Sequence, residues 1–212
     1  MLHISTAKET DLFEHNLPLA DKRITAEACI HRLWFSDADY AEKGNFINWN
    51  PAVKTDEDRK GILQAVLDGR IDVIATDHAP HTLAEKLQPY LQAPSGGPLV
   101  QHALQALLDM HRMGKLTLEQ LVQKTAHNTA TCFQLDGRGF IREGYWADLV
   151  LVDLNRPYRV DKHTILSKCG WSPFEGHTFT STIMHTYVSG NLVYTEGSIV
   201  ENGNAQRLMF NR

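Results

Sequence analysis

The sequence predicts an α/β protein, and three observations lead to that prediction. Short apolar runs such as "IDVIAT" at residues 71–76 are rich in β-branched residues, which is typical of strands buried on both faces of a parallel sheet. Longer segments between them carry apolar residues at helical spacing. From about residue 137 the chain consists of glycine-punctuated, β-rich runs. We therefore expect one region of alternating strands and helices, residues 1–135, and a β-rich region, residues 136–212.

The elements of the first region are justified in chain order. The short apolar runs predict strands near residues 2–4, 24–28 and 71–76. Between the second and third runs, "KTDEDRKGILQAVLDG" places its apolar residues at helical spacing and ends at Gly69, where a helix is expected to stop. A strand, helix, strand order of this kind is typical of a parallel sheet.

Two further helices and a hairpin complete the prediction. "GGPLVQHALQALLDMHRMGK" has one apolar stripe and a closing glycine, Gly114. "TLEQLVQKTAHNTATCFQL" begins with Thr117 and Gln120 at the spacing of a capping box. In the second region, "VSGNLVYTEG" predicts a β-hairpin whose turn is Gly190-Asn191.

Composition excludes several classes of function. The 212 residues include 21 Lys and Arg against 25 Asp and Glu, a net charge of −4, so nucleic acid and anionic membranes are not expected as partners. Three widely spaced cysteines, Cys29, Cys132 and Cys169, indicate a reduced, cytoplasmic setting. No run approaches the roughly 20 apolar residues of a membrane span. The start, "MLHIS", lacks the features of a signal peptide and reads as the inside of a strand.

The motif "IDVIATDHAPHT" places charged and polar residues directly after a buried strand. In parallel α/β folds, ligands bind at the carboxyl ends of strands. There Asp77 could ligate a metal, act as a general base or cap the next helix, and capping is the commonest role of an isolated aspartate. Pro80 stiffens the turn, which would hold His81 in a fixed relation to Asp77.

Several segments together resemble one enzyme family. "LHISTAKE", "ITAEACIHRLWFSD", "NPAVKTDEDRKGILQAVLDG", "IDVIATDHAPHTLAEK" and "GYWADLVLVDL", in their order and spacing, are similar to the carboxyl-terminal half of the dihydroorotases, zinc-dependent cyclic amidohydrolases. "TDHAPHT" is specific, because related hydantoinases and allantoinases usually lack its second histidine. "KCGWSPFEG" is similar to a subgroup of bacterial dihydroorotases. The resemblance implies a partial TIM (β/α)₈ barrel, strands six to eight, in residues 1–135, followed by part of a small β-sandwich in residues 136–212.

The resemblance also implies the site. His3 and Asp77 match metal ligands, and Asp77 also matches the group that handles the catalytic proton; Asn50, His81, Ser95 and Gly96 match substrate-binding positions. The family binds two Zn²⁺ ions per complete site. Its HxHxR motif, its bridging carboxylated lysine and another histidine ligand have no counterpart in this sequence, so the ligand set is incomplete.

The implied activity is the zinc-dependent, reversible hydrolysis of dihydroorotate to N-carbamoyl-L-aspartate, in the de novo synthesis of pyrimidines. Two alternatives stay open. The chain could be a related dihydropyrimidinase or allantoinase, although His81 is suited to the substrate carboxylate that distinguishes dihydroorotate. It could also be an inactive truncated or split subunit that partners a missing amino-terminal half or forms a homo-oligomer. His78 is expected to support Asp77, and His31 and His127 are expected to be structural.

Overall fold

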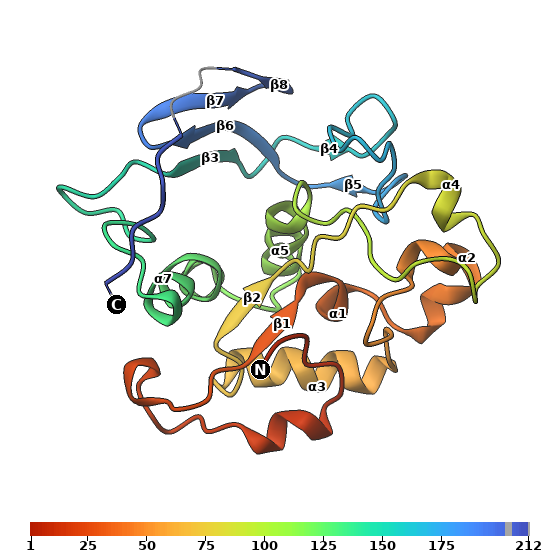
Figure 1. The fold of residues 1–212 in the computed structure, drawn as a ribbon, viewed down its shortest axis with the longest axis horizontal. Helices are drawn as coiled ribbons and strands as arrows, with labels where there is room; N and C mark the ends of the chain where they lie inside the picture. Colours follow the sequence, from red (N-terminus) through yellow and green to blue (C-terminus); the bar gives the residue numbers. More distant parts are fainter. Residues whose placement is uncertain (202–204, 212) are drawn as a thin grey trace.

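The computed structural model describes residues 1–201 and 205–211. Two short parallel strands lie at its centre, β1 (Glu27–Cys29) and β2 (Val73–Ala75), as Figure 1 shows. They pair in register, with Ala28 opposite Ile74. The strands expected near residues 24–28 and 71–76 are therefore present, although each is only three residues long. Their carboxyl ends lead to Ile30 and to Asp77 respectively.

The strand expected at residues 2–4 is not a regular strand, and that prediction is wrong. The segment does run alongside β1, because the Ile4 amide donates to the Glu27 carbonyl and the Glu27 amide donates to the Met1 carbonyl, both at 3.0 Å. Between these bonds His3 has a φ of 58°, a left-handed conformation that interrupts a strand. The segment occupies the place of a neighbouring strand, but its backbone turns at His3.

The predicted helices form with the expected signals at their ends. α3 (Asp56–Leu67) begins where the Thr55 hydroxyl accepts the Asp58 amide at 3.1 Å, and it ends shortly before Gly69, whose φ is 88°. α5 (Ala103–Arg112) lies between the two strands and the top of the molecule in Figure 1 and buries most of its residues. α6 (Leu118–Val122) has the predicted capping box. A π-helical turn, η5 (Gln123–His127), then joins it to α7 (Asn128–Phe133).

Short helical turns fill the connections. They are η1 (Lys8–Leu12), η2 (Leu19–Asp21), α1 (Ile30–Trp34), η3 (Asp37–Asp39), α2 (Tyr40–Lys43), η4 (Gly44–Ile47) and α4 (Leu83–Lys86). α1 follows β1 directly, whereas α4 follows the loop after β2. Along residues 1–201 and 205–211, no helix is both long and apolar enough to cross a membrane.

The β-rich region forms an antiparallel sheet at the top of Figure 1, in the order β3 (Leu149–Asp153), β6 (Thr182–Val188), β7 (Asn191–Thr195) and β8 (Ser198–Ile199). The predicted hairpin is β6–β7. Its turn is Ser189-Gly190, one residue earlier than predicted, and both residues have positive φ, as a tight two-residue hairpin turn requires. A second small sheet pairs β4 (Tyr158–Arg159) with β5 (Thr178–Phe179).

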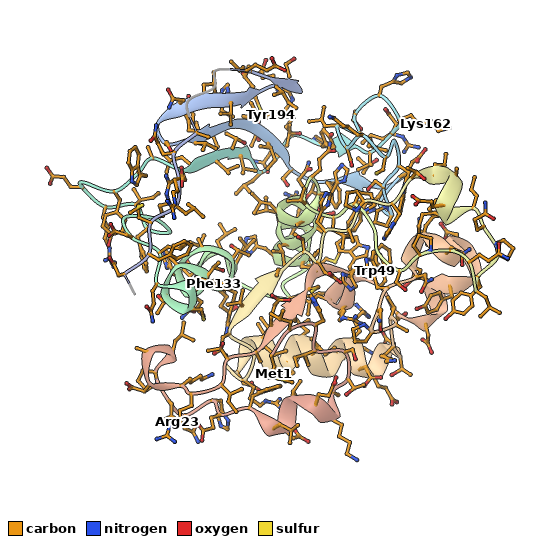
Figure 2. The ribbon with its side chains drawn as sticks, in the orientation of Figure 1. Met1, Arg23, Trp49, Phe133, Lys162 and Tyr194 are labelled. Carbon is orange, nitrogen blue, oxygen red and sulfur yellow. The ribbon has the colours of Figure 1, made fainter. Side chains whose placement is uncertain are left out.

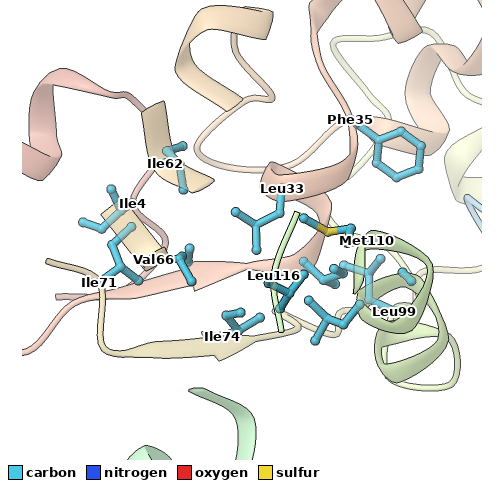
Figure 3. Packing of buried hydrophobic residues seen from close by; sticks show 14 of the residues in the cluster. Ile4, Leu33, Phe35, Ile62, Val66, Ile71, Ile74, Leu99, Met110 and Leu116 are labelled. Carbon is cyan, nitrogen blue, oxygen red and sulfur yellow. The ribbon is translucent and has the colours of Figure 1, made fainter. Parts of the chain in front are cut away.

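One buried apolar cluster joins the two regions. Ile74 of β2 packs there with Leu33 of α1 and with Leu99 before α5, as Figure 3 shows. Phe174 and Phe179, from the β-rich region, belong to the same cluster. The residues around β4 and β5 therefore share the core of the first region, whereas β3, β6, β7 and β8 form a separate layer above α5 in Figure 1.

Candidate metal and substrate site

His3 and Asp77 come from distant parts of the sequence and meet beside the parallel strands. His3 Nε2 lies 3.8 Å from Asp77 Oδ1, and the two side chains are 30% and 26% exposed. Both residues have left-handed backbones, with φ of 58° for His3 and 50° for Asp77. Such conformations cost of order 1–3 kcal/mol outside glycine and cluster at functional sites. Two of them side by side, in residues that can bind a metal, mark this corner as the candidate site.

The other ring nitrogen of His3 faces β1. His3 Nδ1 lies 3.2 Å from Glu27 Oε1 and 3.2 Å from Cys29 Sγ. A proton on Nδ1 that is donated to Glu27 would leave the Nε2 lone pair directed toward Asp77, the arrangement usual for metal-binding histidines. Burial, followed by the Glu27 charge, raises the pKa of Cys29, so that its thiol keeps its proton. Since zinc binds the thiolate, Cys29 is the weaker donor of this group.

His3 and Asp77 fit one side of a zinc centre. Two ligand atoms on a tetrahedral zinc, each about 2.1 Å from it, lie about 3.4 Å apart. The 3.8 Å between His3 Nε2 and Asp77 Oδ1 differs from that by no more than a small side-chain rotation. An imidazole and a carboxylate are also donors that zinc accepts. The pair supplies two of the three or four protein ligands that a zinc site uses.

His81, Ser95 and Gly96 form a second group on the loops after β2. His81 Nε2 donates to the Ser95 carbonyl at 2.9 Å, and the Ala79 amide donates to the Gly97 carbonyl at 3.1 Å. Gly96 has a φ of 125°, and a Cβ on it would lie 2.6 Å from Ala79 Cβ and 3.2 Å from His81 Cδ2. A side chain at Gly96 would therefore displace the turn that carries His81.

Asn50 belongs to a third loop and is exposed. Among the hydrogen bonds of the described residues, none joins its side chain to His81, Ser95 or Gly96. Its backbone is fixed from both sides: the buried Arg32 donates to the carbonyls of Pro51 and Ala52, and the Asn48 carbonyl accepts the Gly96 amide at 2.8 Å. The structure thus brings the loop of Asn50 to the loop of Gly96 through their backbones.

The other histidines make contacts of a structural kind. His31 is buried and stacks on Trp49, labelled in Figure 2, with 4.3 Å between ring centroids. Burial holds the pKa of His31 well below its usual value, so the ring is neutral. His127 stacks on Phe140. His78 Nδ1 accepts the amides of Leu99 and Val100 at 3.0 and 3.2 Å, which fixes the loop that follows Asp77.

Sequence reasoning missed four residues around the site: Glu27, Arg32, Lys86 and Trp171. The indole Nε1 of Trp171 donates to the His81 carbonyl at 2.8 Å, and Lys86 is buried against the same loops. The Thr82–Glu85 spacing of a capping box could have predicted α4. The burial of Lys86 could not be predicted. This turn exposes its apolar residues Leu83 and Leu87 and buries the lysine, the reverse of the usual pattern.

Comparison with known proteins identifies the family of this chain. Residues 3–193 match the model of the amidohydrolase family. The chain is 42% identical over 170 residues to a dihydroorotase of Halobacterium salinarum. This aligned stretch covers 80% of this chain and 40% of that protein. It is 39% identical over 201 residues to a dihydroorotase of Bacillus licheniformis, covering 94% and 46% of the two chains. The chain therefore spans less than half the length of these relatives.

Solved structures with a similar fold are amidohydrolase-type enzymes. The L-hydantoinase (dihydropyrimidinase) of Arthrobacter aurescens superposes with a TM-score of 0.88 at 25% identity, over 98% of this chain and 47% of that chain. The dihydroorotase of Saccharomyces cerevisiae, in complex with 5-fluoroorotic acid, superposes with a TM-score of 0.69 at 16% identity, over 86% and 50%. With the family match over residues 3–193, these comparisons show that the chain belongs to the amidohydrolase family.

Proposed function

We propose that this chain forms part of the active site of a zinc-dependent dihydroorotase, which hydrolyses the cyclic amide of dihydroorotate reversibly to N-carbamoyl-L-aspartate in pyrimidine synthesis. The observation that supports this most directly is the approach of His3 to Asp77, 3.8 Å apart and both with left-handed backbones. The names of the curated relatives supply the substrate class.

In this proposal His3 and Asp77 would hold zinc, which would lower the pKa of bound water toward neutrality and polarise the amide carbonyl. Asp77 accepts the proton of the attacking water and returns it to the departing amide nitrogen. Glu27, 3.2 Å from His3 Nδ1, keeps the imidazole oriented with Nε2 toward Asp77.

Substrate binding is assigned to Asn50, His81, Ser95 and Gly96. His81 Nε2 already donates to the Ser95 carbonyl, so binding the substrate carboxylate requires either a proton on Nδ1 or release of that bond. The Gly96 amide is bonded to Asn48, whereas its carbonyl has a second lone pair that could accept from a ring amide of the substrate. Asn50 can both donate to and accept from the substrate.

The number of metal ligands bears on whether the 212-residue chain alone can have this activity. His3 and Asp77 are two donors, and a catalytic zinc site typically has three. We therefore infer that the chain by itself does not turn over dihydroorotate, and that it acts together with a segment that supplies the other ligands, or within an oligomer. A dihydropyrimidinase activity is the alternative, since an enzyme of that name shares the fold.

The same proposal assigns the parts of the fold. Residues 1–135 would correspond to barrel strands six to eight, with residues 1–4, β1 and β2 in these places, and residues 136–212 to part of a β-sandwich. The parallel pairing of β1 with β2 supports the first assignment, and the antiparallel sheet of β3, β6, β7 and β8 supports the second.

The test is steady-state kinetics with zinc content measured alongside, on the zinc-loaded chain alone and after fusion to the amino-terminal part of a relative. We expect His81→Ala to raise KM for dihydroorotate by about 10- to 100-fold, since a charge-assisted hydrogen bond contributes about 1.5–3 kcal/mol. In the same variant, KM for a dihydropyrimidine without a carboxylate should stay almost unchanged. Asp77→Asn should lower kcat by about 10²–10⁴ in both directions.

The matched control is His163→Ala, because His163 is exposed and belongs to the loop between β4 and β5. It should change neither constant. Equal losses on both substrates in His81→Ala would contradict the carboxylate contact. Near-normal turnover in Asp77→Asn would contradict the proton transfer. Wild-type preference for the carboxylate-free substrate would favour the dihydropyrimidinase alternative.

A further inference from the structure

A buried lysine lies beneath the proposed substrate loops. Lys86, at the end of α4, is 1% exposed, and its ammonium donates to three backbone carbonyls: Gly96 at 2.8 Å, Pro94 at 2.9 Å and Asn48 at 3.3 Å. We propose that Lys86 is the positioning residue of the substrate pocket, fixing the Pro94–Gly96 segment against the loop that leads to Asn50. This inference rests on the proposed function of those loops.

The chemistry of the group fits this task. An ammonium has three N–H donors and no acceptor, and here three carbonyl oxygens receive them. Within residues 1–201 and 205–211, no carboxylate lies within ion-pair distance of Lys86 Nζ. Burying a charge without an opposite charge is unfavourable, and burial lowers the pKa of Lys86 to about 8. Surface attachment of α4 alone would not require a buried ammonium, because an apolar side chain would fill the space without that penalty.

The local sequence directs the ammonium inward. Thr82 and Glu85 form a reciprocal capping box, which fixes the single turn of α4 and places Lys86 at its last position. Asn45 Nδ2 donates to the Lys86 carbonyl at 3.3 Å and to the Gln88 carbonyl at 2.7 Å, so the end of the turn is held to the chain before Asn50. Figure 1 shows α4 at the outer side of the molecule, from which the chain returns toward α5.

Contacts around Lys86 extend its effect to His81. The Asn48 carbonyl accepts both Lys86 Nζ and the Gly96 amide, so one oxygen links the two loops. Trp171 lies with its ring centroid 5.8 Å from Lys86 Nζ, within the range of a cation–π contact, and its Nε1 donates to the His81 carbonyl. Loss of the ammonium would therefore loosen Gly96 and the backbone of His81 without touching His3 or Asp77.

The experiment compares Lys86→Met with Lys124→Met. Lys124 is the matched control, because it is also buried and donates to a carbonyl, that of Ile71, away from the substrate loops. Two readouts are taken: hydrogen exchange of the Gly96 amide, with the Ala106 amide in α5 as internal reference, and KM with kcat for dihydroorotate in the zinc-loaded fusion. Lys86→Gln, which keeps two N–H donors, is measured as well in case Lys86→Met does not fold.

We expect Lys86→Met to speed exchange at Gly96 by about 10-fold or more relative to Ala106, and to raise KM by about 10-fold with kcat changed less than about threefold. Lys86→Gln should change the exchange rate at Gly96 and KM in the same direction but by less. Lys124→Met should change neither quantity. Unchanged exchange at Gly96 in Lys86→Met, or in Lys86→Gln if only that variant folds, would overturn the positioning role.

The two proposals fail separately. If the wild-type fusion does not hydrolyse dihydroorotate, the proposed function fails, and exchange at Gly96 still decides whether Lys86 fixes these loops. If the wild type is active and the Lys86 variants keep its KM, the proposed function stands and the inference about Lys86 is overturned. A fall in kcat equal to the rise in KM would also overturn it, because the effect would then extend to the catalytic groups.

Discussion

Gly96→Ala should destabilise the protein and displace His81, because the structure leaves no room for a side chain at this position. A Cβ on Gly96 would lie 2.6 Å from Ala79 Cβ, 3.0 Å from the Ala79 carbonyl oxygen and 3.2 Å from His81 Cδ2. The first of these contacts is far inside van der Waals separation. The backbone adds a second penalty, since a φ of 125° is unfavourable for any residue with a Cβ.

The two penalties can be separated with a matched glycine. Gly144 also has a positive φ, 81°, but a Cβ there would meet no atom within 4 Å. Gly144→Ala should therefore lower the free energy of unfolding only through its unfavourable backbone conformation, by an amount of order 1–3 kcal/mol. Gly96→Ala should lower the free energy of unfolding by the same backbone contribution and by a further amount of about 1–3 kcal/mol, because the new Cβ would overpack against the Ala79–His81 turn.

Two measurements are made on the two variants and the wild type. Urea titration gives the free energy of unfolding, and the NMR signals of the His81 ring report its position in the folded protein. We expect the midpoint of Gly96→Ala to fall below that of Gly144→Ala, and only Gly96→Ala to shift the His81 signals. Equal midpoints, or an unshifted His81 ring, would refute the argument that Gly96 is required by the close approach of Ala79.

Two further predictions concern buried titratable groups. Burial lowers the pKa of His102 from 6.5 to about 4 in the folded protein, so the unfolded chain binds more protons between these values and stability is lost as pH falls from about 6.5 to about 4. His102→Phe should remove up to about 3 kcal/mol of that pH dependence, seen in urea titrations at several pH values, and an unchanged slope would contradict it. Asp72 forms a buried ion pair with Lys22 at 2.6 Å, so Asp72→Asn should lower the free energy of unfolding by about 3–5 kcal/mol. Asp56→Asn, in an exposed pair, should change it little, and similar losses in both variants would show that burial of the Asp72 pair is unimportant.

The sequence by itself determined the elements whose causes are local. The capping box at Thr117 predicted the start of α6, and Gly69 predicted the end of α3. The turn residues of "VSGNLVYTEG" predicted the hairpin β6–β7, although its turn lies one residue earlier than predicted. The motif "TDHAPHT" identified Asp77 and His81 as candidates because its spacing is specific. The roles proposed for them remain predictions.

Tertiary structure decided what depends on residues distant in the sequence. His3 has a left-handed backbone, which no strand pattern predicts, and that conformation is supported by its approach to Asp77 and by its contact with Glu27. Gly96 is required only because Ala79 lies against it. Lys86 would be placed on the surface by its type alone, yet three carbonyls surround its ammonium, one of them from a loop 38 residues earlier in the chain. Caps, turns and alternating patterns act over a few residues, whereas these positions depend on contacts that exist only after the loops have packed together.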